Sequence, residues 1–122
     1  MATIVHIDIP VGDVQRARTF YETLFNWKFH EVPGYSDYLL FETGDGKSVP
    51  AIGGGLGMRG APDQTITCYI GVDSIADYLP KIEEMGGTIT MPYTEVPGYG
   101  ALALCLDSEG NPFGLWEEKH EI

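Results

Sequence analysis

The 122-residue sequence predicts an α+β protein made of two tandem modules, each with the order strand, helix, strand, strand, strand. The pentapeptide Glu-Val-Pro-Gly-Tyr occurs at residues 31–35 and again at 95–99, and similar residues follow each copy at matching distances. Turn signals and apolar patterns also recur in the same order, although chance resemblance is the alternative. We therefore predict one domain over residues 1–122, with modules at about 1–56 and 64–118.

The first module is predicted to open with a strand at residues 3–9, which are rich in β-branched side chains and end before Pro10. Asp13 suits the N-cap of a helix, and apolar side chains then recur at spacings of three and four from Val14 to Leu24. Extended patterns separated by turn residues predict three further strands, at residues 27–32, 38–43 and 48–53.

The second module repeats this order, and Gly86 and Gly87 are a strong stop signal for its helix. Pro80 lies inside the helical pattern, which predicts either a kink or a helix that begins near this residue. The expected elements are a strand at 65–72, a helix at 74–85, and strands at 88–96, 101–106 and 112–117.

A glycine-rich segment at residues 53–57 lies where the two modules meet. A phosphate-binding loop is disfavoured there, because no Lys-Ser or Lys-Thr pair follows and the next expected element is a strand. We predict a flexible linker at about residues 53–63.

Composition limits the classes of function. The contents of 43% apolar and 20% charged residues are typical of a globular domain. A formal net charge of −11 argues against nucleic-acid binding, which needs clustered Lys and Arg. The sequence has neither a membrane-spanning apolar run nor the basic start of a signal peptide, so we expect a cytoplasmic protein with no membrane partner. Cys68 and Cys105 have neither zinc-ribbon nor redox-pair spacing and are expected to be free thiols.

Strand alternation sorts side chains onto two faces of each sheet. His6 and Asp8 share one face of the first strand, opposite an apolar face that should pack on the helix. The same alternation separates Thr67 and Tyr69 from the apolar residues of the fifth strand, and small residues such as Ala103 leave room in the seventh. The predicted small-molecule site comprises His6, Asp8, Thr67, Tyr69, Ala103 and Trp116. A dimer contact or a wetted surface is the alternative for this face.

Three motifs stand out in the sequence: His6 followed by Val-Gly-Asp at 11–13, Phe-Tyr at 20–21 in the helix, and the closing Asp-Ser-Glu-Gly-Asn-Pro at 107–112. Together they resemble the vicinal oxygen chelate superfamily, which includes glyoxalase I, bleomycin-resistance proteins, fosfomycin-resistance enzymes and extradiol dioxygenases. The resemblance implies a curved mixed sheet around a cavity, with the helices on the outer face. It also implies a divalent metal, bound in catalytic members by His, Gln or Glu from the first and fourth strands of each module.

Only one of those four ligand positions carries a metal ligand in this sequence. His6 matches the first position, whereas the equivalent position of the fifth strand falls on Thr67, a poor ligand. Residues 50–55 contain no ligand, and Gly114 stands at the carboxylate position of the eighth strand. A catalytic metal site usually has three protein ligands, so we predict no metal site and no cofactor.

Without a metal, His6 and Asp8 remain on one strand face, about 7 Å apart by two strand rises. That spacing is long for direct contact, so we expect His6 to form hydrogen bonds within the cavity. An acid–base pair of His6 with Asp8 is the alternative. We predict a glyoxalase-like or bleomycin-resistance-like homodimer that binds an unknown small organic molecule. The alternatives are a metal-dependent lyase or dioxygenase and a non-catalytic subunit that binds a partner.

Overall fold

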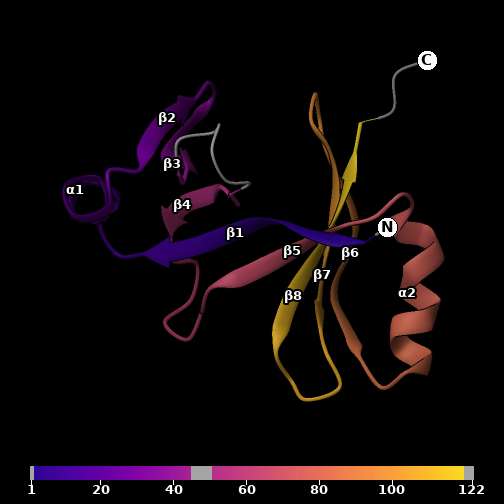
Figure 1. Cartoon of the computed structure of the whole chain (residues 1–122). Coiled ribbons are helices and arrows are strands. Elements are labelled where there is room, and N and C mark those ends of the chain that lie inside the picture. Colours follow the sequence, from indigo (N-terminus) through magenta and orange to yellow (C-terminus); the bar gives the residue numbers. More distant parts are fainter. Residues whose placement is uncertain (1, 45–50, 120–122) are drawn as a thin grey trace. The chain divides into compact units, whose positions relative to one another are not determined.

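The computed structural model describes residues 2–44 and 51–119. Contacts divide the chain into two compact units, which we call the first unit (residues 5–66) and the second unit (residues 67–119 together with 2–4). One helix and four strands follow one another in the order βαβββ, and this order then repeats (Figure 1). The predicted α+β class with two βαβββ modules is confirmed.

The first module forms a mixed four-stranded sheet in the order β2-β3-β4-β1. Strand β4 pairs in parallel with β1, whereas β2 with β3 and β3 with β4 are antiparallel. The elements are β1 (Thr3–Val11), α1 (Val14–Phe25), β2 (Lys28–Val32), β3 (Tyr35–Glu42) and β4 (Gly54–Met58).

The second module has the same topology, in the order β5-β8-β7-β6. Strand β8 pairs in parallel with β5 and antiparallel with β7, which is in turn antiparallel to β6. The elements are β5 (Thr67–Gly71), α2 (Ile75–Glu84), β6 (Thr88–Val96), β7 (Gly100–Leu106) and β8 (Pro112–Glu118).

The position predicted for the fourth strand is wrong. Residues 48–50 lie outside the described residues, and 51–53 are not in a strand. The segment predicted as a flexible linker instead supplies β4, whose Leu56 is fully buried. Glycine has a low strand propensity, so a glycine-rich run favours a linker over a strand. It forms a strand because β1 and β3 pair with it on both sides.

Local capping explains where the two helices begin. Asp13 caps α1 as predicted, with its carboxylate accepting a 3.0 Å hydrogen bond from the Arg16 backbone N–H.

Helix α2 begins at Ile75, so the alternative prediction of a helix that begins near Pro80 is wrong. Its N-cap residue makes no side-chain capping bond; instead, Glu117 of β8 accepts a 2.8 Å hydrogen bond from the Ile75 N–H.

An aromatic stack fixes α1 against its sheet. The rings of Tyr21 and Trp27 are stacked with centroids 4.8 Å apart, and Trp27 stacks on Phe41 at 5.0 Å. These rings contact the buried cluster that includes Leu39 and Leu56. The apolar face of β1 adds Ile9 and Val11 to the same cluster. The opposite face of this sheet, which carries His6 and Asp8, is therefore turned away from the helix.

The repeated pentapeptide and the closing motif at residues 107–112 both form turns between strands. Both copies of the pentapeptide form a hairpin turn with glycine in the left-handed region, at φ 89° for Gly34 and φ 87° for Gly98. In the closing motif, Asp107 Oδ1 accepts hydrogen bonds from the backbone N–H groups of Glu109 and Asn111, at 2.8 and 2.9 Å. This motif thus builds the turn between β7 and β8.

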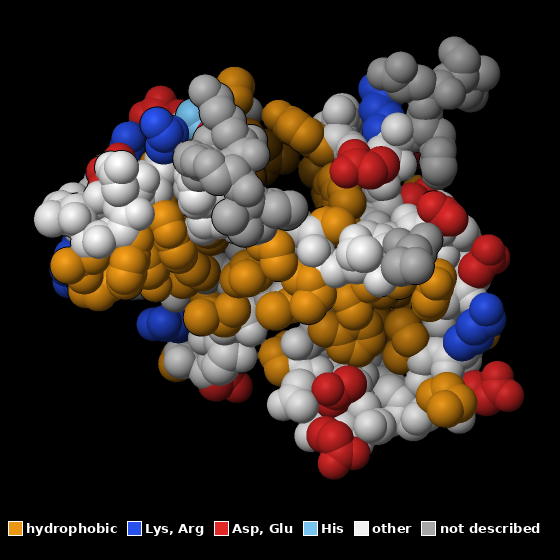
Figure 2. Space-filling model, viewed as in Figure 1, with side chains coloured by type: hydrophobic (Ala, Val, Ile, Leu, Met, Phe, Trp, Pro, Cys, Tyr) orange, Lys and Arg blue, Asp and Glu red, His pale blue; other side chains and the backbone are white. Residues whose placement is uncertain are grey.

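Apolar side chains are also exposed on the first unit. Phe20, Leu24 and Phe25 of α1 are 54%, 58% and 57% exposed. Figure 2, viewed as in Figure 1, shows hydrophobic side chains gathered near α1, at the left of the picture. Leu24 therefore lies outside the buried stripe that its helical spacing predicted. Within the described part of the chain, the two helices are too short to span a lipid bilayer.

We predict that Asp107→Asn makes the protein less stable at neutral pH. Hydrogen bonds from the Asn111 and Glu109 backbone N–H groups lower the pKa of Asp107 below its ordinary 3.8. A depressed pKa adds stability that is present above the ordinary value and is lost as the pH falls through the folded value. Urea unfolding from pH 7 to 2 should therefore show a deficit for the variant that shrinks in acid. A deficit of constant size would contradict this account.

Candidate functional site

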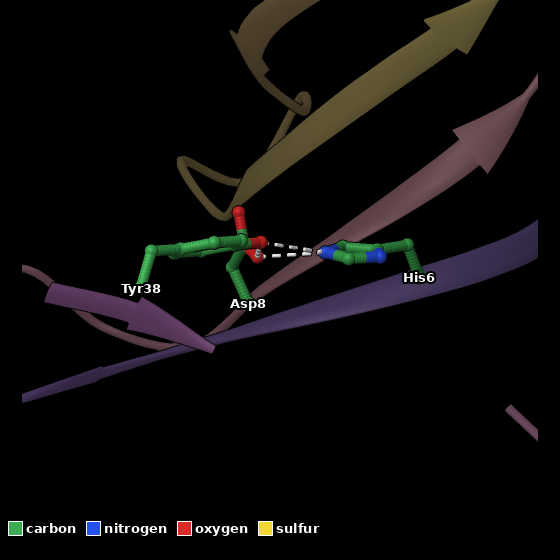
Figure 3. Close-up of polar contacts among 3 residues, drawn as sticks. All are labelled: His6, Asp8 and Tyr38. Carbon is green, nitrogen blue, oxygen red and sulfur yellow. Dashed lines mark hydrogen bonds and ion pairs between the residues drawn. The ribbon is translucent and has the colours of Figure 1, made fainter. Parts of the chain in front are cut away.

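A cluster of three polar side chains lies on the sheet face of the first unit that is turned away from α1. His6 Nε2 is 2.7 Å from Asp8 Oδ1, and the Tyr38 hydroxyl donates a 2.8 Å hydrogen bond to the same oxygen. His6 Nε2 is also 3.2 Å from the Tyr38 hydroxyl oxygen. Figure 3 shows the three side chains pointing toward one another from β1 and β3. The cluster is half-buried, with side-chain exposures of 28% for His6 and 32% for Asp8.

The structure corrects the expected separation of His6 and Asp8. Two strand rises set the spacing of the backbone positions, but side chains on one face can lean along the strand. The two lean toward each other until they are in hydrogen-bond contact. Tyr38, which comes from another strand, was missing from the predicted site; it lies 30 residues from Asp8 in the chain.

Donor and acceptor roles follow from the chemistry of the carboxylate. A carboxylate only accepts hydrogen bonds, so both the His6 Nε2–H and the Tyr38 O–H donate to Asp8. A neutral His6 ring then carries its lone pair on Nδ1. A carboxylate that orients an imidazole in this way is an arrangement used in general acid–base catalysis. The cluster can therefore transfer a proton as well as hold a ligand.

Two glycines of β4 make room for the Tyr38 ring. Gly55 pairs with Asp8, and Gly57 pairs with both Pro10 and Tyr38. A Cβ atom at position 55 would contact the Tyr38 Oη and Cζ atoms and would lie 2.7 Å from Asp8 Oδ1. A Cβ atom at position 57 would lie 2.8 Å from Tyr38 Cδ1. The ring crosses the glycine strand and delivers its hydroxyl to Asp8.

A cleft of about 470 Å³ opens beside this cluster, entirely within the first unit. Its lining combines Asp8 and Tyr38 with the turn between β2 and β3 and with the residues after β4. The lining residues are Asp8, Ile9, Pro10, Gly34, Tyr35, Ser36, Asp37, Tyr38, Gly57, Met58 and Gln64. One copy of the repeated pentapeptide therefore contributes to a concave, mostly uncharged surface next to the polar cluster.

The other predicted site residues lie in the second unit. Thr67, Tyr69 and Trp116 are on the sheet face away from α2, because their neighbours Ile70 and Leu115 pack into the helix-side core. The ring of Tyr69 covers Gly114, where a Cβ atom would contact the Cδ2 and Cε2 atoms of the ring. This parallels the way in which the Tyr38 ring covers the glycines of β4.

Ala103 was placed on the wrong face. It is fully buried and packs with Ile75 of α2, Ala101 and Leu115. Small side chains were expected to leave room for a ligand, but here they allow the helix to approach the sheet closely. Cys105, on the same face of β7, is 1% exposed, and burial raises the pKa of its thiol. A buried thiol of this kind serves as core packing.

The donor set around His6 has few groups to offer a divalent metal. Asp8 and Tyr38 occupy its Nε2 nitrogen, and the β4 residue beside Asp8 is Gly55, covered by a ring. Gly114 of β8 is covered in the same way. Across residues 2–44 and 51–119, no three His, Cys, Asp or Glu side chains are grouped so that they could hold a metal ion.

Comparison with known proteins identifies relatives of the whole chain. The family model of the Glyoxalase/Bleomycin resistance protein/Dioxygenase superfamily matches residues 3–115. CFP32 from Mycobacterium bovis, named as a glyoxylase, is 29% identical over 121 residues, which are 95% of this chain and 46% of the relative. The anthracycline biosynthesis protein DnrV from Streptomyces peucetius is 29% identical over 126 residues, covering 91% of this chain and 45% of DnrV. The chain thus spans about half the length of these curated relatives.

Solved structures share the fold at lower identity. The hypothetical protein BH1468 from Bacillus halodurans matches with a TM-score of 0.71 and 16% identity, covering 99% of this chain and 97% of that one. A Streptomyces coelicolor methylmalonyl-CoA epimerase in complex with 2-nitronate-propionyl-CoA matches with a TM-score of 0.69 and 12% identity, covering 96% and 97%. At these identities the likeness concerns the fold alone.

We predict that Gly55→Ala lowers the free energy of unfolding by about 1 to 3 kcal/mol, the usual cost of overpacking. The added methyl group would contact the Tyr38 ring and displace it from Asp8. Gly12→Ala is the matched control, because a Cβ atom there meets nothing within 4 Å. Chemical denaturation of Gly55→Ala in a Tyr38→Ala background should show a smaller loss. An equal loss in both backgrounds would mean that the ring does not lie over Gly55.

Proposed function

Because the chain belongs to the Glyoxalase/Bleomycin resistance protein/Dioxygenase superfamily, we propose that it binds a small organic molecule in the cleft beside His6, Asp8 and Tyr38, without a divalent metal. The observation that carries this proposal is the position of the Tyr38 ring. It lies over Gly55 and Gly57 and connects the polar cluster to the cleft, which both Asp8 and Tyr38 line.

The chemistry of the donors supports a site without metal. A zinc ion needs about three nitrogen, sulfur or carboxylate ligands with further groups that orient them. His6 Nε2 is already within hydrogen-bond distance of Asp8 and Tyr38, and Gly55 and Gly114 supply no donor side chain. These residues do not fit the divalent metal that the family resemblance implies, so we assign no step to a metal.

The cleft has the features of a small-molecule site. Pro10, Met58 and the tyrosine rings give it apolar walls, and Asp8, Asp37 and Gln64 add a few polar groups. Such a mixture provides apolar contact area together with hydrogen bonds that fix orientation. Because two donors hold Asp8, its carboxylate is oriented before a ligand arrives, which reduces the entropy lost on binding.

A fragment screen by amide NMR tests the proposal. We expect small aromatic molecules to shift the backbone signals of Gly34, Gly55 and Gly57, and to do so equally with EDTA or with added zinc. The Gly110 amide, which belongs to a turn of the second unit, is the internal control. Fragment binding that requires zinc, or zinc shifts at His6 that His6→Ala removes and His30→Ala does not, would contradict the proposal. So would a screen in which no fragment moves Gly34 or Gly57, the glycines that line the cleft.

A further inference from the structure

We propose that the cleft of the first unit selects an organic cation, in particular an amine attached to a flat apolar ring. The inference rests on the proposed function and adds to it the chemical class of the ligand. It follows from three features of the cleft: the orientation of Asp8, the charges on its lining, and the tyrosine at its edge.

The first feature is the second carboxylate oxygen of Asp8. Oδ1 accepts hydrogen bonds from both His6 and Tyr38, and the other oxygen points away from both partners (Figure 3). Within the described residues no hydrogen bond reaches Oδ2, and Asp8 lines the cleft. The cluster thus fixes one acceptor oxygen where a donor group of a ligand can reach it, and His6 and Tyr38 act as positioning residues.

The second feature is the sign of the charges. Among the described residues that line the cleft, Asp8 and Asp37 are charged, and Lys, Arg and His are absent. The guanidinium group of Arg59 is hydrogen-bonded to the Pro10 carbonyl oxygen at 3.1 Å, and Arg59 does not line the cleft. The formal net charge of −11 adds a long-range field of the same sign. An anionic ligand would meet two carboxylates there, whereas an amine would form charge-assisted hydrogen bonds.

The third feature is the flat surface beside these carboxylates. Tyr35 follows the turn between β2 and β3, lines the cleft and is 53% exposed. An aromatic face attracts both flat rings and ammonium groups. Pro10 and Met58 extend the apolar wall. A ring against Tyr35 would place an attached amine within the same cleft as Asp8 and Asp37.

Three probes of matched shape test the charge preference: tyramine as the cation, 4-ethylphenol as the neutral molecule and 4-hydroxyphenylacetate as the anion. Titrations followed at the Gly34 and Gly57 amides should give tyramine an affinity about tenfold above that of 4-ethylphenol, the effect of one charge-assisted hydrogen bond. The anion should bind more weakly than either. Asp37→Asn should reduce the tyramine preference several-fold, and Asp8→Asn should reduce it further.

The controls separate this inference from the proposed function. Asp73→Asn removes the same charge from an exposed position of the second unit and should leave the preference unchanged. Tyr38→Phe keeps the ring and removes the donor to Asp8, and it should weaken tyramine binding more than 4-ethylphenol binding. Equal affinity for cation and neutral probe, or tighter binding of the anion, would overturn the inference while the cleft remained a binding site. If none of the three probes shifted the cleft amides while other fragments of the screen did, the inference would fail and the proposed function would stand.

Discussion

The hydrogen bond from the Tyr38 hydroxyl to Asp8 is the interaction on which the organisation of the first unit's polar face depends. It requires the phenol ring to cross β4, and the ring fits only because positions 55 and 57 carry no side chain. The same bond fixes Asp8 beside His6 and orients the carboxylate that lines the cleft. Glycine in a strand normally costs stability, so its use here is explained by the close approach of the ring.

The second unit uses a similar arrangement on its own sheet. Tyr69 of β5 covers Gly114 of β8, the strand that corresponds to β4. In both modules the last strand therefore presents glycine beneath a tyrosine ring, where the superfamily resemblance leads one to expect a metal ligand. A ring that fills this space leaves no room for a carboxylate side chain. The family fold is thus retained, with glycines and tyrosine rings at these two strand positions.

The sequence was sufficient for the element order, the Asp13 cap and the shared face of His6 and Asp8, because periodicity and capping are local properties. It was insufficient where distant residues decide the outcome. Residues 54–58 form a strand because of their neighbours in the sheet. Alternation alone does not say which face of β7 lies beneath α2, and for this reason Ala103 was misplaced.

Tyr38 was missed because only the register of β3 with β4 brings it to Asp8. The extended apolar pattern of residues 38–41, followed by a glycine-rich segment, was the signal that could have indicated it.

We propose that Tyr38, rather than a metal, completes the environment of His6. Anomalous diffraction at the zinc, nickel and manganese edges, from crystals of untagged protein grown without chelator, tests this claim most directly. We expect no anomalous peak beside His6 and the Tyr38 hydroxyl in hydrogen-bond contact with Asp8. A peak at about 2.1 Å from a His6 ring nitrogen, the usual distance for zinc, with the Tyr38 ring turned away from Gly55, would contradict it.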